Sequence, residues 1–160
     1  MTPAAHLLSL DQLSGHYPSS FSKEVAGLLG RAFPTYLRRK NVPSTPILLA
    51  RAHDSASASL RDAFVCGLVL SGSNVHELET LSLRDWTSYV NHHQSALSVY
   101  IGPQTETSQF IAVPKETPHV IHFFVKGEFL REAALSALVN IADGGNYYSG
   151  TGTLSFGKHP

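Results

Sequence analysis

The sequence predicts an α/β fold with a mixed, mostly parallel sheet. Short apolar runs alternate with longer stretches in which apolar residues recur every three or four positions. The first strands are separated by helices, as parallel strands require, whereas the later ones follow closely and are expected to pair antiparallel. A chain of 160 residues that is 42% hydrophobic suits one domain with its own core. We therefore expect a single domain over 1–160.

The first helix is expected to begin after Ser22, whose hydroxyl can cap it, with Glu24 in the favourable first turn. Its apolar residues recur on one face at Val25, Leu28, Leu29, Ala32, Phe33, Tyr36 and Leu37. Pro34 lies inside this pattern and predicts a kink or a separated last turn, because proline lacks an N–H. The basic run 38–40 then suits a solvated helix end.

A buried strand over 46–50 and a second helix follow, the helix being capped within 54–59. Gly72 is placed to adopt a left-handed conformation after that helix. Residues 75–78 should form the next strand, and 81–91 a third helix.

Three further strands are expected, over 95–101, 109–113 and 119–125. The last helix should cover 128–141. From 143 to 160 glycine, serine and tyrosine dominate, which predicts a flexible or linker-like tail, a loop or a short hairpin.

The charge of the chain excludes some partners. Twelve basic and twelve acidic residues cancel, so neither nucleic acid nor an anionic membrane is an expected partner. The first ten residues lack the pattern of a signal peptide and no stretch is apolar enough to span a membrane, so a cytoplasmic location is expected. Cys66 is the one cysteine, which excludes an intrachain disulfide; we expect it to be a small core residue.

The usual catalytic and metal-binding patterns do not occur. His92 and His93 are adjacent, and His119 and His122 fall on opposite faces of a strand, so no metal site is predicted. The run 53–55 brings His, Asp and Ser together, but neighbouring residues rarely form a catalytic triad and helix capping explains them better. No nucleotide-binding glycine loop is present, and the glycines at 150–153 are read as a loop although they could hold an anion.

Five segments in the first half of the chain carry a further signal through their order and spacing. They are Ser14-Gly15-His16, Phe21-Ser22-Lys23-Glu24, Leu29-Gly30-Arg31-Ala32-Phe33, the stretch 48–60 around Arg51-Ala52-His53-Asp54, and the stretch 63–75. Together they resemble the first domain of the α-D-phosphohexomutases, the family of the phosphoglucomutases and phosphomannomutases. The resemblance covers residues 13–80 well and the rest loosely, and it implies a three-layer α/β/α domain.

The resemblance also implies that the catalytic centre has been lost. The family carries its phosphate on a serine in a loop after the strand at 96–99, and an ungapped match puts Gly102 at that position and Pro103 at the following histidine. Thr105, Thr107 and Ser108 lie nearby, but none sits in the motif, and whether one of them replaces the serine stays open. We therefore assign no catalytic residue.

The resemblance further implies where a phosphate could still bind. Arg51, His53 and Ser57 are the candidate phosphate-binding residues, since Arg51 survives from the family pattern. The family binds Mg²⁺ and recognises the sugar in domains to which nothing here is similar, so no cofactor is expected. Phosphoryl transfer depends on positioning and charge neutralisation, which this chain alone should not supply.

Three hypotheses follow. The first is a non-catalytic homologue of a phosphohexomutase first domain, with a binding or assembly role linked to phosphosugar metabolism, whose partner is a protein, a second copy or a phosphosugar. The second is a subunit of a split mutase whose metal and sugar sites lie on another chain, which would make it part of an intramolecular phosphotransferase. The third is an unrelated α/β interaction domain.

Overall fold

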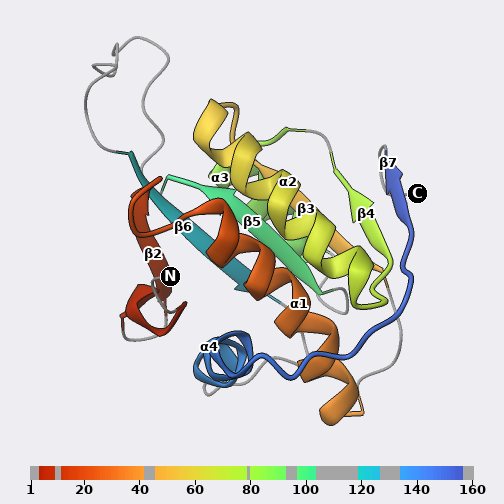
Figure 1. Cartoon of the computed structure of the whole chain (residues 1–160). Coiled ribbons are helices and arrows are strands. Elements are labelled where there is room, and N and C mark those ends of the chain that lie inside the picture. Colours follow the sequence, from red (N-terminus) through yellow and green to blue (C-terminus); the bar gives the residue numbers. More distant parts are fainter. Residues whose placement is uncertain are drawn as a thin grey trace, which may run out of the picture.

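The computed structural model describes residues 4–9, 12–41, 46–78, 80–92, 97–103, 119–126 and 134–156, which form one seven-stranded sheet with helices on both faces (Figure 1). The strands are β1 (Leu8–Ser9), β2 (Gln12–Tyr17), β3 (Ile47–Arg51), β4 (Val75–Glu77), β5 (Ser98–Gly102), β6 (His119–Lys126) and β7 (Leu154–Phe156). Their order across the sheet is β1-β2-β6-β5-β3-β4-β7.

The sheet is mixed, as predicted. β3 pairs in parallel with both β4 and β5, and β4 pairs in parallel with β7. β5 and β6, β6 and β2, and β2 and β1 pair antiparallel. The consecutive strands β3, β4 and β5 are separated by helices and run in the same direction, because a crossover helix returns the chain to the same end of the sheet.

The helices form the two outer layers. They are the 3₁₀ helix η1 (Ala4–Leu7), α1 (Lys23–Arg39), α2 (Ser55–Leu70), α3 (Leu83–His92) and α4 (Ala134–Gly144). α1, α2 and α4 share one core with one face of the sheet, while α3 packs in a second core against the other face. This confirms the three-layer α/β/α architecture. No helix among the described residues is both long enough and apolar enough to cross a membrane.

The larger core centres on phenylalanines from three elements. The ring of Phe64 in α2 lies 5.0 Å from that of Phe123 in β6 and 5.5 Å from that of Phe33 in α1, both edge to face. All three are buried. Edge-to-face pairs of this kind add to the stabilisation that burial itself gives.

Backbone contact joins α1 to α2. A Cβ atom at Gly30 would lie 2.2 Å from the carbonyl oxygen of Phe64, and one at Gly67 would lie 2.2 Å from that of Gly27. Only glycine permits this approach at either position. The two helices therefore lie directly against each other with no side chain between them at the crossing.

The smaller core, under α3, is aromatic and hydrogen-bonded. Trp86 packs 5.4 Å from Tyr100 between ring centroids, and its indole Nε1–H donates to Ser98 Oγ at 2.8 Å. The Ser98 hydroxyl in turn donates to the carbonyl of Leu48 at 2.9 Å. The indole and hydroxyl of this core are thus satisfied, as buried polar groups must be to avoid a large penalty.

The predicted helix signals largely hold. Ser22 caps α1 by accepting from the amide of Val25 at 3.2 Å. Gly72 follows α2 with φ +92°, the left-handed conformation expected there. Pro34 lies inside α1, but the helix continues to Arg39 and no last turn separates. Tertiary packing, with Pro34 itself buried, outweighs the missing hydrogen bond.

The segment before α1 and Cys66 both differ from the sequence predictions. Ser14, Gly15 and His16 lie within β2, a strand that was not predicted, because that segment pairs with β6 from Leu13 to Tyr17. Cys66 is exposed rather than in the core. The buried face of α2 runs through Phe64, Gly67 and Leu68, and Cys66 points away from it.

The described part of the C-terminal tail, predicted as a flexible or linker-like tail, a loop or a short hairpin, makes ordered contacts. Residues 145–153, here called the strap, cross the C-terminal ends of α1 and α2, and the chain then forms β7 beside β4 (Figure 1). The glycines and tyrosines of this segment predicted a loop. In the structure Gly152 allows the backbone to approach Ser73 closely, and the ring of Tyr148 stacks on Arg38. The strand expected at 109–113 and the residues 128–133 of the last predicted helix lie outside the described residues.

Candidate functional site

The sheet has its topological switch point between β3 and β5. From β3 the chain passes to β4 on one side, and then returns to form β5 on the other side of β3. In open α/β sheets ligands bind outside the carboxyl ends of the strands at such a point. We call residues 51–54 and 102–103, at the carboxyl ends of β3 and β5, the rim. The amide of Ala52 donates to the carbonyl of Ile101 at 3.0 Å, which joins its two halves.

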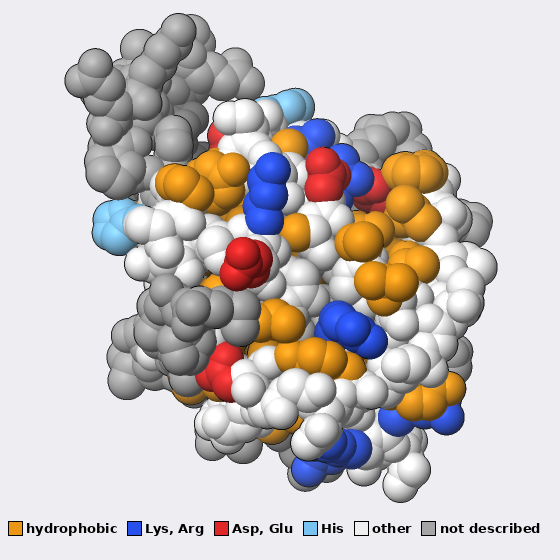
Figure 2. All heavy atoms as spheres, in the orientation of Figure 1, with side chains coloured by type: hydrophobic (Ala, Val, Ile, Leu, Met, Phe, Trp, Pro, Cys, Tyr) orange, Lys and Arg blue, Asp and Glu red, His pale blue; other side chains and the backbone are white. Residues whose placement is uncertain are grey.

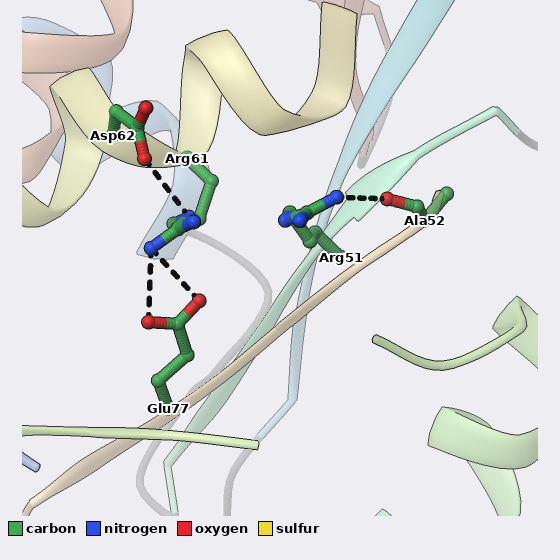
Figure 3. Close-up of polar contacts among 5 residues, drawn as sticks. All are labelled: Arg51, Ala52, Arg61, Asp62 and Glu77. Carbon is green, nitrogen blue, oxygen red and sulfur yellow. Dashed lines mark hydrogen bonds and ion pairs between the residues drawn. The ribbon is translucent and has the colours of Figure 1, made fainter. Parts of the chain in front are cut away.

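Arg51 is the last residue of β3 and supplies the cation of the rim. Its Nη1 donates to the carbonyl oxygen of Ala52 at 2.8 Å (Figure 3), and the side chain is half-buried. It forms no ion pair with another residue that the structure describes. His53 follows in the bend before α2 and is exposed. Both candidate residues therefore lie at the switch point.

Ser57 is engaged in the cap of α2. Its amide donates to Asp54 Oδ2 at 2.9 Å, and its hydroxyl donates to Asp54 Oδ1 at 2.8 Å. The side chain is fully buried. A phosphate could reach this hydroxyl only by displacing the cap, so the rim as it stands offers Arg51 and His53 but not Ser57.

A neighbouring cluster pairs one arginine with two carboxylates. Arg61 of α2 lies 2.9 Å from the carboxylate of Glu77 at the end of β4, and its Nε lies 3.1 Å from Asp62 (Figure 3). Glu77 is 8% exposed, and a carboxylate buried to that extent needs a partner. The guanidinium of Arg61 is thus occupied, and of these two neighbouring arginines it is Arg51 that remains for a ligand.

The ungapped match predicts that Gly102 lies in a loop. In the structure Gly102 is instead the last residue of β5, in register with His122. A Cβ atom there would lie 2.7 Å from Cε1 of Tyr100 and 3.0 Å from Cβ of Ala52. Tyr100 is 1% exposed, and its hydroxyl donates to the carbonyl of Leu81 at 2.8 Å. The space that a serine would need at this position is filled by a fixed aromatic ring.

His122 lies beside the rim, although its sequence pattern predicted no site there. Its ring stacks on that of Phe124 at 5.4 Å, and its Nδ1 is buried with no hydrogen-bond partner among the described residues. Burial lowers the pKa of His122, because desolvation disfavours the charged imidazole. Its two-residue spacing from Phe124 on a strand was the available signal, since it places both on one face.

Three further candidates follow β5 in the sequence. Thr105, Thr107 and Ser108 lie outside the described residues. Within the described part of the chain, no three His, Cys, Asp or Glu side chains gather as ligands for a metal ion.

Two solved structures are similar to the chain over nearly its whole length. A phosphoglucomutase/phosphomannomutase family protein from Burkholderia thailandensis superposes with a TM-score of 0.75 over 98% of this chain, at 15% sequence identity. A protein from Thermus thermophilus assigned as a candidate phosphomannomutase gives a TM-score of 0.69 over 93% of this chain, at 11% identity. No protein-family model and no curated protein matches the sequence.

The match concerns part of each of those proteins. The chain spans about a third of their length, 33% of the first and 32% of the second. At this level of identity the comparison shows the fold, and the phosphohexomutase resemblance expected from the sequence is confirmed for the fold.

Proposed function

We propose that this chain is a non-catalytic phosphohexomutase-like domain with a binding or assembly role in phosphosugar metabolism. The observation that carries the proposal concerns Gly102, the residue that the ungapped match sets against the family's phosphoserine: it ends β5, and a Cβ atom there would lie 2.7 Å from Cε1 of Tyr100. A phosphoserine there would require the ring to leave its pocket and to lose the hydrogen bond to Leu81. The fold shared with two mutase-like proteins supports the link to phosphosugars.

The ligand that suits the rim is the phosphate group of a sugar phosphate. Arg51 offers a guanidinium without an ion pair among the described residues, and its planar fork matches phosphate oxygens. His53 lies exposed two residues later and can add a second contact. With one retained arginine, we expect weak binding and no phosphoryl transfer.

Two measurements test the proposal. Hexose 1-phosphate and hexose 6-phosphate are titrated into the protein while amide shifts are followed by NMR, and their interconversion is assayed with Mg²⁺ present. We expect shifts at residues 51–54, loss of binding in Arg51→Gln, and retained binding in Arg39→Gln, which removes an exposed arginine at the far end of α1. Interconversion of the two phosphates above background would overturn the non-catalytic assignment. Absence of binding by both phosphates would remove the phosphosugar role.

A second candidate is a subunit of a split mutase whose metal and sugar sites lie on another chain. It is favoured by the coverage, because the two solved proteins are about three times as long as the part that matches. Affinity purification of the tagged chain from its own cells should then recover a protein similar to the remaining domains, and the recovered pair should interconvert hexose phosphates. Recovery of this chain by itself would count against this candidate.

A further inference from the structure

Two arginines on one stripe of α1 lie against the strap. Arg31, Thr35 and Arg38 follow one another at steps of four and three residues, so they share one face of the helix. Cζ of Arg31 lies 5.1 Å from the centroid of the Tyr147 ring. Cζ of Arg38 lies 3.8 Å from that of the Tyr148 ring, and Thr35 Oγ1 accepts from the amide of Tyr148 at 2.8 Å. We call Arg31, Arg38, Tyr147 and Tyr148 the arginine–tyrosine patch.

The two tyrosine rings point in different directions along the strap. The hydroxyl of Tyr147 donates back to the carbonyl of Ala142 in α4. The ring of Tyr148 lies instead over Gly72, after α2, where a Cβ atom would be 3.1 Å from its Cε1. The rings therefore hold the two arginines at separate places. Positions seven residues apart on a helix are separated by about 10 Å along its axis, which sets the spacing of the two positive charges.

The charge of these arginines is not balanced within the described part of the chain. The ion pairs there are those of Arg61, and neither arginine of the patch takes part in one. Oδ1 of Asp143, at the end of α4, accepts from the amide of Ala4 at 2.6 Å. The sequence from 25 to 53, which includes most of α1, contains no acidic residue. Figure 2 shows Lys and Arg side chains at the lower end of this face, where the strap crosses the C-terminal half of α1.

Stacking on tyrosine leaves the binding edge of a guanidinium available. The ring occupies a face of the guanidinium, whereas the N–H groups that bind carboxylates point outward in its plane. Arg31 uses its Nε on Ser71 Oγ at 3.2 Å, and Arg38 is exposed. Because the tyrosines already hold both side chains in place, less entropy is lost when a partner binds. Tyrosine and arginine are also enriched among the residues that dominate binding at protein interfaces.

We propose that the arginine–tyrosine patch binds an acidic segment of a protein partner, in which two carboxylates three residues apart pair with Arg31 and Arg38. An extended segment in the polyproline II conformation has three residues per turn and rises about 9 Å over them. Carboxylates at that interval therefore lie on one side of the segment, at nearly the spacing of the two arginines. This site is separate from the rim, and its occupation does not depend on a phosphate there.

The neutral balance of the chain favours a short acidic segment over a nucleic acid. Twelve basic and twelve acidic residues cancel, so a long polyanion meets no net attraction. A short segment interacts with the charges within about 10 Å of it, because salt screens those farther away. Around the patch these near charges are the two arginines, and the basic run 38–40 adds to them.

Peptide titration tests the spacing on the unchanged protein. The probe is a fluorescein-labelled octapeptide of glycine, serine and proline that carries two glutamates three positions apart, and its fluorescence anisotropy reports binding. A control peptide carries the two glutamates side by side, and a second carries glutamines in their place. The spaced peptide should bind about fivefold more tightly than the adjacent one, which is the effect of one exposed charge pair. The glutamine peptide should not bind.

Variants of the patch test where the peptide binds. Arg31→Gln and Arg38→Gln should each weaken the spaced peptide about fivefold. Arg39→Gln is the matched control, since it removes the same charge from the same end of α1, and Arg39 is exposed and stacks on no ring of the described residues. Arg51→Gln, which removes the arginine of the rim, should also leave peptide binding unchanged, so the two sites can fail separately.

Three results would overturn the proposal. A spaced peptide that does not bind, or binds no better than the adjacent one, removes the pairing with two arginines. An equal loss in Arg39→Gln and Arg38→Gln shows an effect of general charge instead of the patch. Tighter binding of a single-stranded trinucleotide, whose two phosphodiesters carry the same charge as the peptide's two glutamates, replaces the acidic protein segment by a nucleic acid.

Discussion

A tyrosine ring lies over a glycine at each end of α2, but the two tyrosines are held in different ways. At the rim, Tyr100 covers Gly102, is 1% exposed and donates to the carbonyl of Leu81. At the strap, Tyr148 covers Gly72, with Cε1 3.1 Å from a Cβ placed there, and is 38% exposed. Tyr100 is thus part of a core, whereas Tyr148 lies at the surface.

The contacts around each ring explain the difference. Tyr100 packs against Trp86 and Phe124 in the core beneath α3. Tyr148 stacks under the guanidinium of Arg38 at 3.8 Å, and its amide donates to Thr35 Oγ1 at 2.8 Å. Burial removes a ring's freedom to move, whereas a surface stack can open without unfolding the domain. The comparison indicates a closed rim and a strap that can open locally.

The largest expected effect follows from removing the core tyrosine. Tyr100→Ala should lower the free energy of unfolding by about 3–5 kcal/mol, since it removes a buried aromatic ring from a packed core. Tyr148→Ala should cost clearly less, because much of that ring is already in water. Urea denaturation of both variants measures the difference. Equal losses would contradict the distinction between the two ends.

Filling the glycine at the rim should have the next largest effect. Gly102→Ala should destabilise the domain by about 1–3 kcal/mol, because the added methyl group meets the ring of Tyr100. The double variant Gly102→Ala with Tyr100→Ala should lose less stability than the sum of the losses in the two single variants, since the ring that causes the clash is gone. Strict additivity in a double-mutant cycle would show that the contact between the two positions is not responsible.

Acid should destabilise the sheet beside the rim through His122. Burial lowers the pKa of His122 in the folded protein below its unfolded value, so the unfolded state binds the proton more readily. The stability is therefore fully present above the ordinary histidine pKa of about 6.5 and falls as the pH drops below it. In His122→Phe, the urea midpoint at mildly acidic pH should lie closer to the midpoint at neutral pH than it does in the wild type. The control His16→Gln, at an exposed position, should keep the wild-type loss.

The smallest effect is expected at the strap. Arg38→Ala removes the cation from the Tyr148 ring and should cost about 0.5–1 kcal/mol. Amide exchange should accelerate at Gly150 and Gly152, which donate to the end of α2, while global stability changes little. Arg39→Ala serves as the control, since Arg39 is exposed beside it. Exchange that stays slow in Arg38→Ala would show that the hydrogen bonds alone hold the strap.

Local patterns predict much of this architecture. The caps at Ser22 and Asp54 and the left-handed Gly72 follow from the chemistry of single residues. The alternation of strands and helices indicates parallel pairing, and the motif order indicates the family whose fold the chain shares. These features depend on neighbours along the chain, which the sequence displays.

The features that the sequence did not reveal depend on distant partners. β2 forms because β6, about a hundred residues later, pairs with it. The tail becomes a strap because Thr35, Arg38 and Asn74 bind it. At the site, position 102 could be singled out, but the ring that fills it could not, since its orientation is set by a hydrogen bond to Leu81.

The contact of α1 with α2 at Gly30 and Gly67 has a mechanical consequence. With backbone against backbone, no rotamer change at the crossing can absorb a shift, and close-packed interiors compress little. If a ligand at Arg51 displaced α2, α1 would therefore have to move together with it. The strap contacts the C-terminal ends of both helices, at the opposite end of the domain from Arg51. Ligand binding at the rim would therefore change the position of the strap.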